Sequence, residues 1–524
     1  MSKAMRVLPV LLLLSCLISN PLLAQTPSVV GFVDTHSHPF SNVGFGGRLV
    51  CGKVFDPDGI DKALVDCPNH YPDGSAAIFE NFFHNGSPLG THDPVGWPTF
   101  AYWPAHNSLT HQQVYYEWLQ RAWKGGLRIF VNQLVANRVM CILSNTVSLN
   151  VSDCSEQTQI QLEAKKTYEL QDYIDSLNGG PGKGWLRIVT SPAQARAVIA
   201  QGKLAMVLGI ESSEIFGCKK SKDLLELIFG SSCTKSNIDK GLQAIYDLGV
   251  RSLFLCHKFD NALCGVRFDP SVQGVIVNAG NFLSAGSFWQ AQTCAPGTPS
   301  DNTIAPNGVI PGFLSSLVPA LPLYPPAPHC NVNGLTDLGK YALQGMINRH
   351  MLVEIDHMSV KAAAQVLATL EAAHYPGVIS GHSWMDPRYY PRVYNLGGFV
   401  GLYGTSADQF ANGWRDTAAA RRAAGIYGLG YGLDANGLGE QPAPRPNNMI
   451  NPVVYPFTTI TGLSFDRLST GQRNWDINTE GVANYGLTTD WIEDMRHVAG
   501  NDLVDEMAAG AEAYLRTWEG AVAH

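Results

Sequence analysis

The stretch VVGFVDTHSH at residues 29–38 joins a run of apolar residues to two histidines, His36 and His38. Short apolar runs rich in β-branched and aromatic residues are typical of strands buried in a parallel sheet. Side chains alternate along a strand with a period of two, so His36 and His38 point in the same direction. The stretch therefore predicts a buried strand that presents two imidazoles at its carboxyl end.

Seven further runs of the same character follow along the chain. They lie at 127–133, 204–210, 251–256, 350–355, 377–381, 397–402 and 427–433. Helical patterns separate several of them, most clearly at 238–249 and 359–374. Alternating strands and helices favour parallel β/α units, and eight strands suit a TIM-type (β/α)8 barrel. We therefore predict an α/β protein in which residues 25–524 form one elaborated barrel domain.

Three segments are predicted to be insertions into this barrel, near 39–110, 141–185 and 265–332. Each follows a predicted strand, so each should lie over the carboxyl ends of the strands, where barrel enzymes carry their active sites. The first insertion is rich in histidine, and we expect it to form a polar lid. An additional metal site is the alternative. Its histidines are His70, His84, His92 and His106, and His111 follows directly after it.

The N-terminus predicts export. Lys3 and Arg6 precede the apolar stretch 8–19, and Ala24 is a plausible cleavage point, so residues 1–24 are interpreted as a signal peptide. A lipoprotein site at Cys16 is the minor alternative. No later segment is long and apolar enough to be expected to cross a bilayer. The expected location is therefore secreted or periplasmic.

The composition indicates which binding partners are unexpected and whether the cysteines form disulfides. Without Lys3 and Arg6 the formal net charge goes from −8 to −10, and an acidic chain without basic runs is not expected to bind nucleic acid. Removing Cys16 from the 11 cysteines leaves ten, an even number that suggests disulfides in an exported protein. The cysteines fall in close sequential couples, but the sequence leaves their connectivity open. The couples are Cys51/Cys67, Cys141/Cys154, Cys218/Cys233, Cys256/Cys264 and Cys294/Cys330.

Residues of metal-ligand type end four more of the predicted strands. Glu211 follows 204–210, His357 follows 350–355, His382 follows 377–381 and Asp434 follows 427–433. Imidazole and carboxylate groups suit Zn²⁺ or a similar divalent ion. A carboxylate can be shared between two ions, and Glu211 is the candidate for this bridging position. The series predicts a metal centre at the carboxyl end of the barrel.

These segments, in this order, resemble the membrane dipeptidase (renal dipeptidase, peptidase M19) family of the amidohydrolase superfamily. KGGLRIFV at 124–131, KLAMVLGIES at 203–212 and LGVRSLFLCHKFDN at 248–261 are each similar to a segment of that family. So are the segment 333–359, PGVISGHS at 376–383, GLDANG at 432–437 and the closing helices. The likeness covers most of the mature chain.

The resemblance implies a role for each matched residue. His36 and His38 would bind one ion with Glu211, which would bridge to a second ion completed by His357 and His382. The two ions would generate hydroxide from water at neutral pH. His257 would contact the substrate carbonyl and stabilise the oxyanion, and Asp434 would pass a proton from the water to the leaving amine. Asp490 is the rival for Asp434, although its setting is typical of a helix start.

The chain also departs from the family. The family has His-x-Asp where this chain has His36-x-His38, which makes the site more positive. An arginine after the last histidine holds the substrate carboxylate in the family, and Arg388 and Arg392 are the candidates here, although neither matches the spacing cleanly. Dipeptide specificity is therefore the least certain part of the comparison.

Three functions follow as hypotheses. The first is an exported hydrolase with two divalent ions, expected to be zinc, that cleaves a dipeptide or related amide. The second keeps the fold and metals but acts on a lactone, ester or cyclic amide, and the third is a non-catalytic binding protein. A homodimer is compatible with the resemblance, since members of the family are often dimers.

Overall fold

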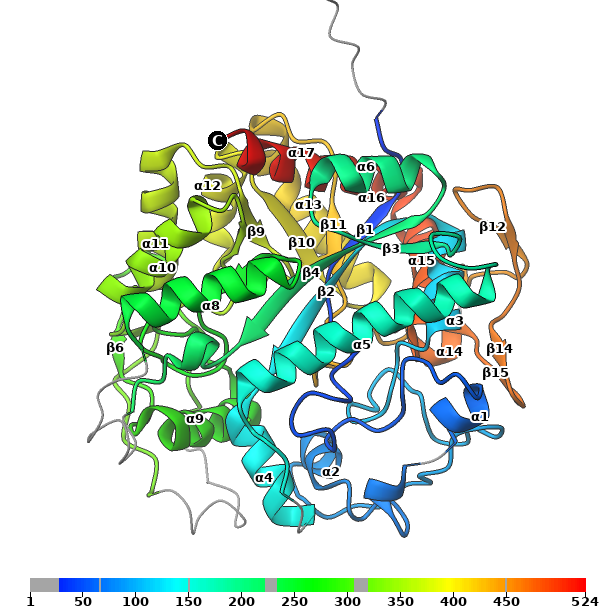
Figure 1. Ribbon diagram of the computed structural model, residues 1–524, viewed down its shortest axis with the longest axis horizontal. Coiled ribbons are helices and arrows are strands. Elements are labelled where there is room, and N and C mark those ends of the chain that lie inside the picture. The colour runs from blue at the N-terminus through cyan, green and yellow to red at the C-terminus, as the bar shows by residue number, and fades with distance from the viewer. Residues whose placement is uncertain (1–27, 66, 149–150, 222–232, 306–318, 448–449) are drawn as a thin grey trace, which may run out of the picture.

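The centre of the computed structural model is a closed ring of eight parallel strands. Figure 1 shows several of these strands crossing the middle of the molecule between the helices. The structure describes residues 28–65, 67–148, 151–221, 233–305, 319–447 and 450–524. In ring order the strands are β1 Phe32–Ser37, β2 Leu127–Ala136, β4 Leu204–Ser212, β5 Val250–Phe254, β8 Leu352–Glu354, β9 Val378–Ser380, β10 Phe399–Tyr403 and β11 Gly430–Gly432. Each pairs in parallel with the next, and β11 pairs with β1. The predicted (β/α)8 barrel is confirmed, and each predicted run overlaps one barrel strand.

A further strand, β3 (Leu186–Val189), lies outside the ring and was not predicted. It pairs with the first half of β4, from Leu186 opposite Leu204 to Val189 opposite Val207. The β2 strand pairs with β4 along nearly its whole length, from Ile129 to Ala136. Four residues are too few to give a clear periodic signal, so the sequence does not predict β3.

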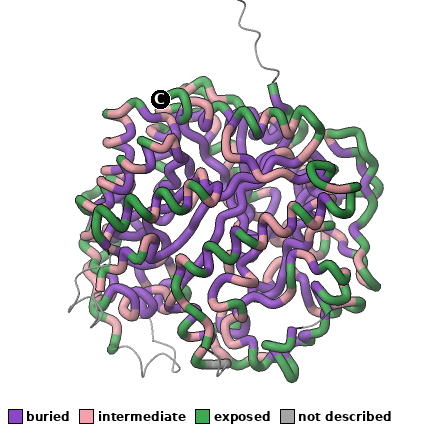
Figure 2. The backbone as a smooth tube through the Cα atoms, in the orientation of Figure 1, coloured by how far each residue is buried: buried purple, intermediate pink, exposed green. Residues whose placement is uncertain are grey.

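Helices surround the barrel, and their outer faces are exposed while the strands are buried (Figure 2). The α11 helix illustrates why these segments are helical. Ser359 caps its first turn by accepting a hydrogen bond from the Ala362 amide at 3.0 Å, and its buried residues recur every three or four positions. The outer helices are α3 Tyr116–Gly125, α5 Glu156–Leu177, α6 Pro192–Ala200, α8 Lys235–Asp247, α10 Asp337–Ile347, α11 Val360–Ala373, α12 Tyr390–Asn395, α13 Ala407–Ala423, α15 Thr488–Ala499, α16 Asn501–Ala508 and α17 Gly510–Ala523.

The segment that follows β1, residues 39–115, contains short helices and long irregular stretches. We call it the lid; its helices are α1 (Ile60–Ala63), η1 (Pro68–His70) and α2 (Ile78–Asn85). Figure 1 shows α2, α4 (Arg138–Ser148) and α9 (Ser271–Ala285) at the end of the molecule toward which β2 and β4 point. Within 141–185, α5 packs against β2 and β3, whereas α4 contacts α9. The segment thus contributes to both the helical layer and the barrel mouth.

Small elements complete the structure. They are η2 Ile215–Gly217, η3 Pro387–Tyr389, η4 Tyr485–Leu487, α14 Ile477–Glu480 and the antiparallel strand pairs β6/β7 (Ala291–Thr293, His329–Asn331), β12/β13 (Phe457–Thr458, Ser464–Phe465) and β14/β15 (Ser469–Thr470, Arg473–Asn474). The β6/β7 pair belongs to the predicted insertion 265–332, of which residues 306–318 lie outside the described part.

Five disulfides join the cysteines in their sequential couples. They are Cys51–Cys67, Cys141–Cys154, Cys218–Cys233, Cys256–Cys264 and Cys294–Cys330. Structural disulfides are typical of proteins that reside in an oxidising compartment. The predicted signal peptide and Cys16 lie outside the described residues, and within the described part no helix has the length and apolar character that a membrane span requires.

Candidate metal centre

The structure brings seven of the residues predicted from the sequence together at the carboxyl end of the barrel. They come from or directly after six different strands: His36 and His38 from β1, Glu211 from β4, His257 after β5, His357 after β8, His382 after β9 and Asp434 after β11. All seven are almost fully buried except Asp434, whose side chain is 16% exposed. The barrel therefore concentrates imidazoles and carboxylates that are far apart in the sequence.

One half of the site groups two imidazoles with two carboxylates. The Nε2 atoms of His36 and His38 lie 3.0 Å apart. Glu211 Oε2 lies 3.5 Å from His36 Nε2 and 3.4 Å from His38 Nε2, and Asp434 Oδ1 lies 3.0 Å from His38 Nε2. Ligand atoms bound about 2.0–2.1 Å from a tetrahedral zinc ion lie about 3.3 Å from one another. The spacing of these four groups therefore suits one ion.

The other half adjoins it through the same carboxylate. Glu211 Oε1 lies 3.1 Å from His357 Nε2, and Glu211 Oε2 lies 3.4 Å from His257 Nε2. His382 Nε2 lies 2.9 Å from His357 Nε2. Glu211 thus stands between the two groups of imidazoles, which is the position expected of a bridging ligand.

An unusual backbone conformation directs two of these side chains toward the site. His357 and Asp434 have φ values of 63° and 54°, in the left-handed region that residues other than glycine rarely adopt. The Asp434 amide donates a hydrogen bond to the His36 carbonyl at 2.8 Å, which fixes the end of β11 against β1. Strained backbone of this kind is concentrated at functional sites.

Outer hydrogen bonds orient two of the imidazoles. His38 Nδ1 lies 2.7 Å from the Gln133 carbonyl oxygen, so this nitrogen is the donor and Nε2 faces the site. His382 Nδ1 donates to Asp356 Oδ2 at 3.0 Å, and Asp356 Oδ1 also accepts from Ser380 Oγ at 2.7 Å. Asp356, the residue before His357, is thus the outer partner of His382.

The electrostatics of the site favour a cation. Burial raises the pKa of Glu211, but electrostatic attraction to His257 and His36 lowers it more. The pKa of Glu211 therefore lies well below its ordinary value. Burial lowers the pKa of His36 to about 4, with a further contribution from His382. Burial also disfavours the charged form of His38, yet hydrogen bonds to Asp434 and Glu211 raise its pKa to about 10. The negative charge that retains a proton on His38 would equally retain a metal ion.

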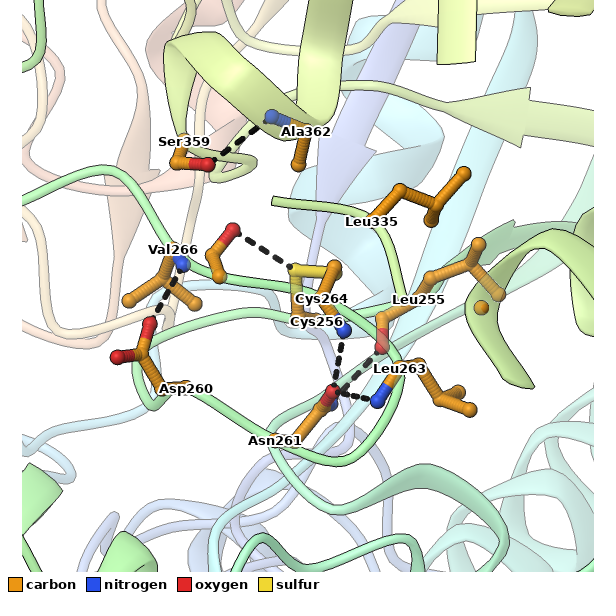
Figure 3. The surroundings of a disulfide bond; sticks show 12 residues. Leu255, Cys256, Asp260, Asn261, Leu263, Cys264, Val266, Leu335, Ser359 and Ala362 are labelled. Atoms are coloured by element: carbon orange, nitrogen blue, oxygen red, sulfur yellow. Dashed lines mark hydrogen bonds between the residues drawn. A yellow bond between two sulfur atoms is a disulfide. The ribbon is translucent and has the colours of Figure 1, made fainter. Parts of the chain in front are cut away.

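A disulfide and several hydrogen bonds cross-link the loop that follows β5 (Figure 3). The Cys256–Cys264 disulfide closes it at the residue before His257. The Asn261 side chain forms three hydrogen bonds within the loop. It accepts from the amides of Leu263 at 2.8 Å and Cys264 at 2.9 Å, and it donates to the Leu255 carbonyl at 2.9 Å. These contacts fix the direction in which His257 leaves the strand.

A cavity of about 380 Å³ opens from the metal centre toward the lid. His257, His357, His382 and Asp434 line its floor. Its walls are mainly apolar and come from the lid, α4, α9 and the loop after β11: Phe45, Phe83, Val139, Met140, Leu143, Ile276, Val277, Leu283 and Leu438. Such a volume suits a small molecule.

The structure does not bring Arg388 and Arg392 to this cavity. Arg388 pairs with Asp386, its Nη2 lying 2.6 Å from Oδ2, and Arg392 pairs with Glu371 of α11 at 2.7 Å. Both arginines are therefore engaged in the outer layer. Asp490, the rival of Asp434, lies in α15, where it pairs with Arg121 and accepts a hydrogen bond from Tyr455 at 2.8 Å.

A lysine that was not predicted as a site residue borders the cavity instead. Lys258 Nζ lies 2.9 Å from Asp269 Oδ1 and 5.3 Å from the centroid of the Trp384 ring, and all three residues line the cavity. Among the described residues that line this cavity, none is an arginine. The position of Lys258 directly after His257 is the only sequence signal that could have indicated it.

Comparisons with known proteins add the following. No protein-family model matches the chain, and no curated protein matches it. Among solved structures, the chain is similar to an amidohydrolase from Pseudomonas aeruginosa, with 13% identity, TM-score 0.40, and coverage of 78% of this chain and 93% of that one. It is also similar to a dipeptidase of metallopeptidase family M19, with 13% identity, TM-score 0.41, and coverage of 77% and 88%. A third is a metallopeptidase from Rhodobacter sphaeroides liganded with a phosphinate mimic of the dipeptide L-Ala-D-Ala, with 12% identity, TM-score 0.39, and coverage of 79% and 88%. At this level of similarity, the functional argument comes from the geometry of the site itself.

Proposed function

We propose that this protein is an exported, metal-dependent hydrolase that cleaves an amide bond in a small, dipeptide-like substrate. The observation that carries the proposal is the convergence of four imidazoles on one buried carboxylate. Glu211 has the Nε2 atoms of His36, His38, His257 and His357 within 3.5 Å of its oxygens, and two of these histidines, His257 and His357, line the cavity.

The residues present fit two divalent ions. Glu211 Oε1 is buried and accepts no well-aligned hydrogen bond, although His357 Nε2 lies 3.1 Å away, and the paired Nε2 atoms at 3.0 Å and 2.9 Å face each other. Buried polar atoms are normally satisfied, so unpartnered ones at a convergent site indicate a missing partner. His36 and His38 would hold one ion with Glu211, and His357 and His382 would hold the other. Zinc suits this set of nitrogen and oxygen donors.

Divalent ions at this position would polarise the scissile carbonyl and lower the pKa of a water molecule. The residues around them would complete the reaction. Asp434 borders the cavity. Burial raises the pKa of Asp434, but the hydrogen bond and the positive charge of His38 lower it more, so that the pKa lies below its ordinary value. Asp434 is therefore a carboxylate that can accept a proton from water and deliver it to the leaving amine.

His257 would stabilise the charge that develops on the carbonyl oxygen. Burial lowers its pKa to about 3, so the imidazole is neutral, and it lines the cavity beside His357. A neutral imidazole can donate one hydrogen bond to an oxyanion. Lys258, on the same loop, would attract a substrate carboxylate.

The apolar walls support a second candidate, an enzyme that opens a lactone, ester or cyclic amide. Such a substrate would need no carboxylate anchor and would bury hydrocarbon against Met140, Leu143 and Ile276. The two candidates share the site and differ only in the bond that is cleaved.

Export is supported by the five disulfides, since such bonds persist outside the reducing cytosol. The apolar segment at 8–19 is the proposed signal.

The test is a substrate panel with zinc-loaded protein. Dipeptides and chromogenic esters and lactones are offered to the wild type, to Asp434→Asn and to Glu440→Gln. Glu440 is an exposed carboxylate on the same cavity and serves as the matched control. We expect dipeptide hydrolysis that falls about 10²–10⁴-fold in Asp434→Asn and changes less than about twofold in Glu440→Gln. Ester or lactone cleavage without dipeptide cleavage would select the second candidate, and no hydrolysis of either class would refute both.

A further inference from the structure

The lid contains a second buried cluster of metal-ligand side chains, separate from the barrel centre. Its members are His70, Glu80, His92 and His111, which are only 3%, 1%, 8% and 0% exposed. His70 ends η1, Glu80 lies in α2, His92 lies in the loop after α2, and His111 pairs with Cys51 in an isolated bridge. Four segments of the lid therefore meet at one point.

The ligand atoms are close enough to bind one ion. One atom each from Glu80, His92 and His111 lies within 4.8 Å of the others. Glu80 Oε2 lies 2.9 Å from His111 Nδ1, and the His92 and His111 ring centroids lie 5.1 Å apart. Two histidines and one carboxylate form a known set of three protein ligands for zinc, in which water takes the fourth position.

Two buried polar atoms of the cluster have no hydrogen-bond partner. Glu80 Oε1 and His92 Nε2 are buried and make no hydrogen bond. In the described part of the chain, no lysine or arginine forms an ion pair with Glu80. An unsatisfied buried polar atom costs about 1–3 kcal/mol, and a charged one costs more. A bound cation would satisfy both atoms at once.

Neighbouring groups hold the ligands in place, as outer hydrogen bonds do in metal sites. Thr110 donates to Glu80 Oε2 from its hydroxyl at 2.6 Å and from its amide at 3.0 Å. His70 Nδ1 lies 3.2 Å from His111 Nε2, so His111 can donate from this nitrogen while its Nδ1 faces the ion. His92 stacks on Tyr102 with the ring centroids 4.5 Å apart.

We propose that Glu80, His92 and His111 bind a structural zinc ion that fixes the lid, with His70 orienting His111. The lid has little regular structure of its own, so an ion that joins α2 to the segments around His92 and His111 would define its shape. The α2 helix also carries Phe83, which lines the catalytic cavity. The proposed ion would therefore set one wall of that cavity, but its binding does not depend on the chemistry proposed there.

The test measures zinc per chain by elemental analysis after zinc loading and removal of free metal. Glu80→Gln and His92→Ala are compared with the wild type and with His84→Ala. His84 lies in the same helix as Glu80 but outside the cluster. We expect each cluster variant to contain one zinc ion fewer than the wild type and His84→Ala to match it. Equal zinc content in all four proteins would overturn the proposal and leave a purely hydrogen-bonded lid.

A second measurement covers the case in which the variants do not fold. Crystals of the zinc-loaded wild type are measured at the zinc absorption edge, and we expect an anomalous peak between Glu80, His92 and His111. Absence of this peak would overturn the proposal. Glu211→Ala distinguishes the two sites, since it should lose zinc from the barrel and keep the lid ion. A lid peak without a barrel peak would therefore refute the proposed function alone.

Discussion

Asp356 offers a quantitative test of the barrel centre without touching a proposed ligand. Its Oδ2 accepts from His382 Nδ1 at 3.0 Å and from the His382 amide at 2.9 Å, and its Oδ1 accepts from Ser380 Oγ at 2.7 Å. Asp356→Ala removes both of these oxygens. His382 therefore loses both of its hydrogen bonds to this side chain together with the negative charge that strengthens them.

The magnitude follows from the bond that the His382 ring loses. A hydrogen bond to a charged group contributes about 1.5–3 kcal/mol. Each 1.4 kcal/mol is a factor of ten, so the ion held by His382 should bind about 10- to 150-fold more weakly. Loss of an outer partner of a metal-binding histidine typically costs a similar 10- to 100-fold.

The assay is competition with a chromogenic chelator on zinc-loaded protein, which resolves ions of different affinity. Ser380→Ala is the control, since it removes one bond to Asp356 and keeps both bonds to His382. We expect zinc to bind more weakly to Asp356→Ala and less than about a threefold change in affinity in Ser380→Ala. Unchanged zinc affinities in Asp356→Ala would refute the assignment of His382 as a ligand.

Three further predictions concern the surroundings of the site. Lys258→Met should raise KM at least about tenfold for a substrate with a free carboxylate and leave kcat nearly unchanged. Lys258→Arg should recover part of the loss. Equal KM values in the wild type and Lys258→Met would exclude Lys258 as the residue that binds the substrate carboxylate. Replacing both Cys256 and Cys264 by serine should lower the free energy of unfolding by about 2–3 kcal/mol in calorimetry, because the closed loop is short; an unchanged Tm would contradict this. Burial raises the pKa of Glu163 from 4.5 to about 8, so the folded chain keeps a proton that the unfolded chain releases, and stability falls as pH rises through that interval. Glu163→Gln should therefore stabilise the protein by up to about 5 kcal/mol near pH 8 and have little effect near pH 4, as measured by denaturant unfolding; equal stabilisation at both pH values would contradict it.

The barrel was predictable from the sequence because its strands are buried on both faces. Such strands appear as continuous apolar runs, and the residue after each run falls at the carboxyl end of the barrel. For this reason Glu211, His357 and His382 could be placed at one site before any contact was known. The short strand β3 carries too few residues to give the same signal.

Features that depend on long-range contacts could not be predicted. Asp356 reaches His382 across neighbouring strands, and the lid cluster joins segments without regular structure. Arg388 and Arg392 were chosen by distance along the chain, but Asp386 and Glu371 hold them in the outer layer. Side-chain pairing of this kind depends on the packing of helices against the barrel, which the local pattern does not encode.

The central proposal is that Glu211 bridges two metal ions at the carboxyl end of the barrel. Its most direct test is the zinc content per chain of Glu211→Ala and wild type, prepared side by side and checked for an unchanged fold by circular dichroism. We predict that the variant contains about two zinc ions fewer than the wild type and hydrolyses none of its substrates. Equal zinc content in the two folded proteins would contradict the claim.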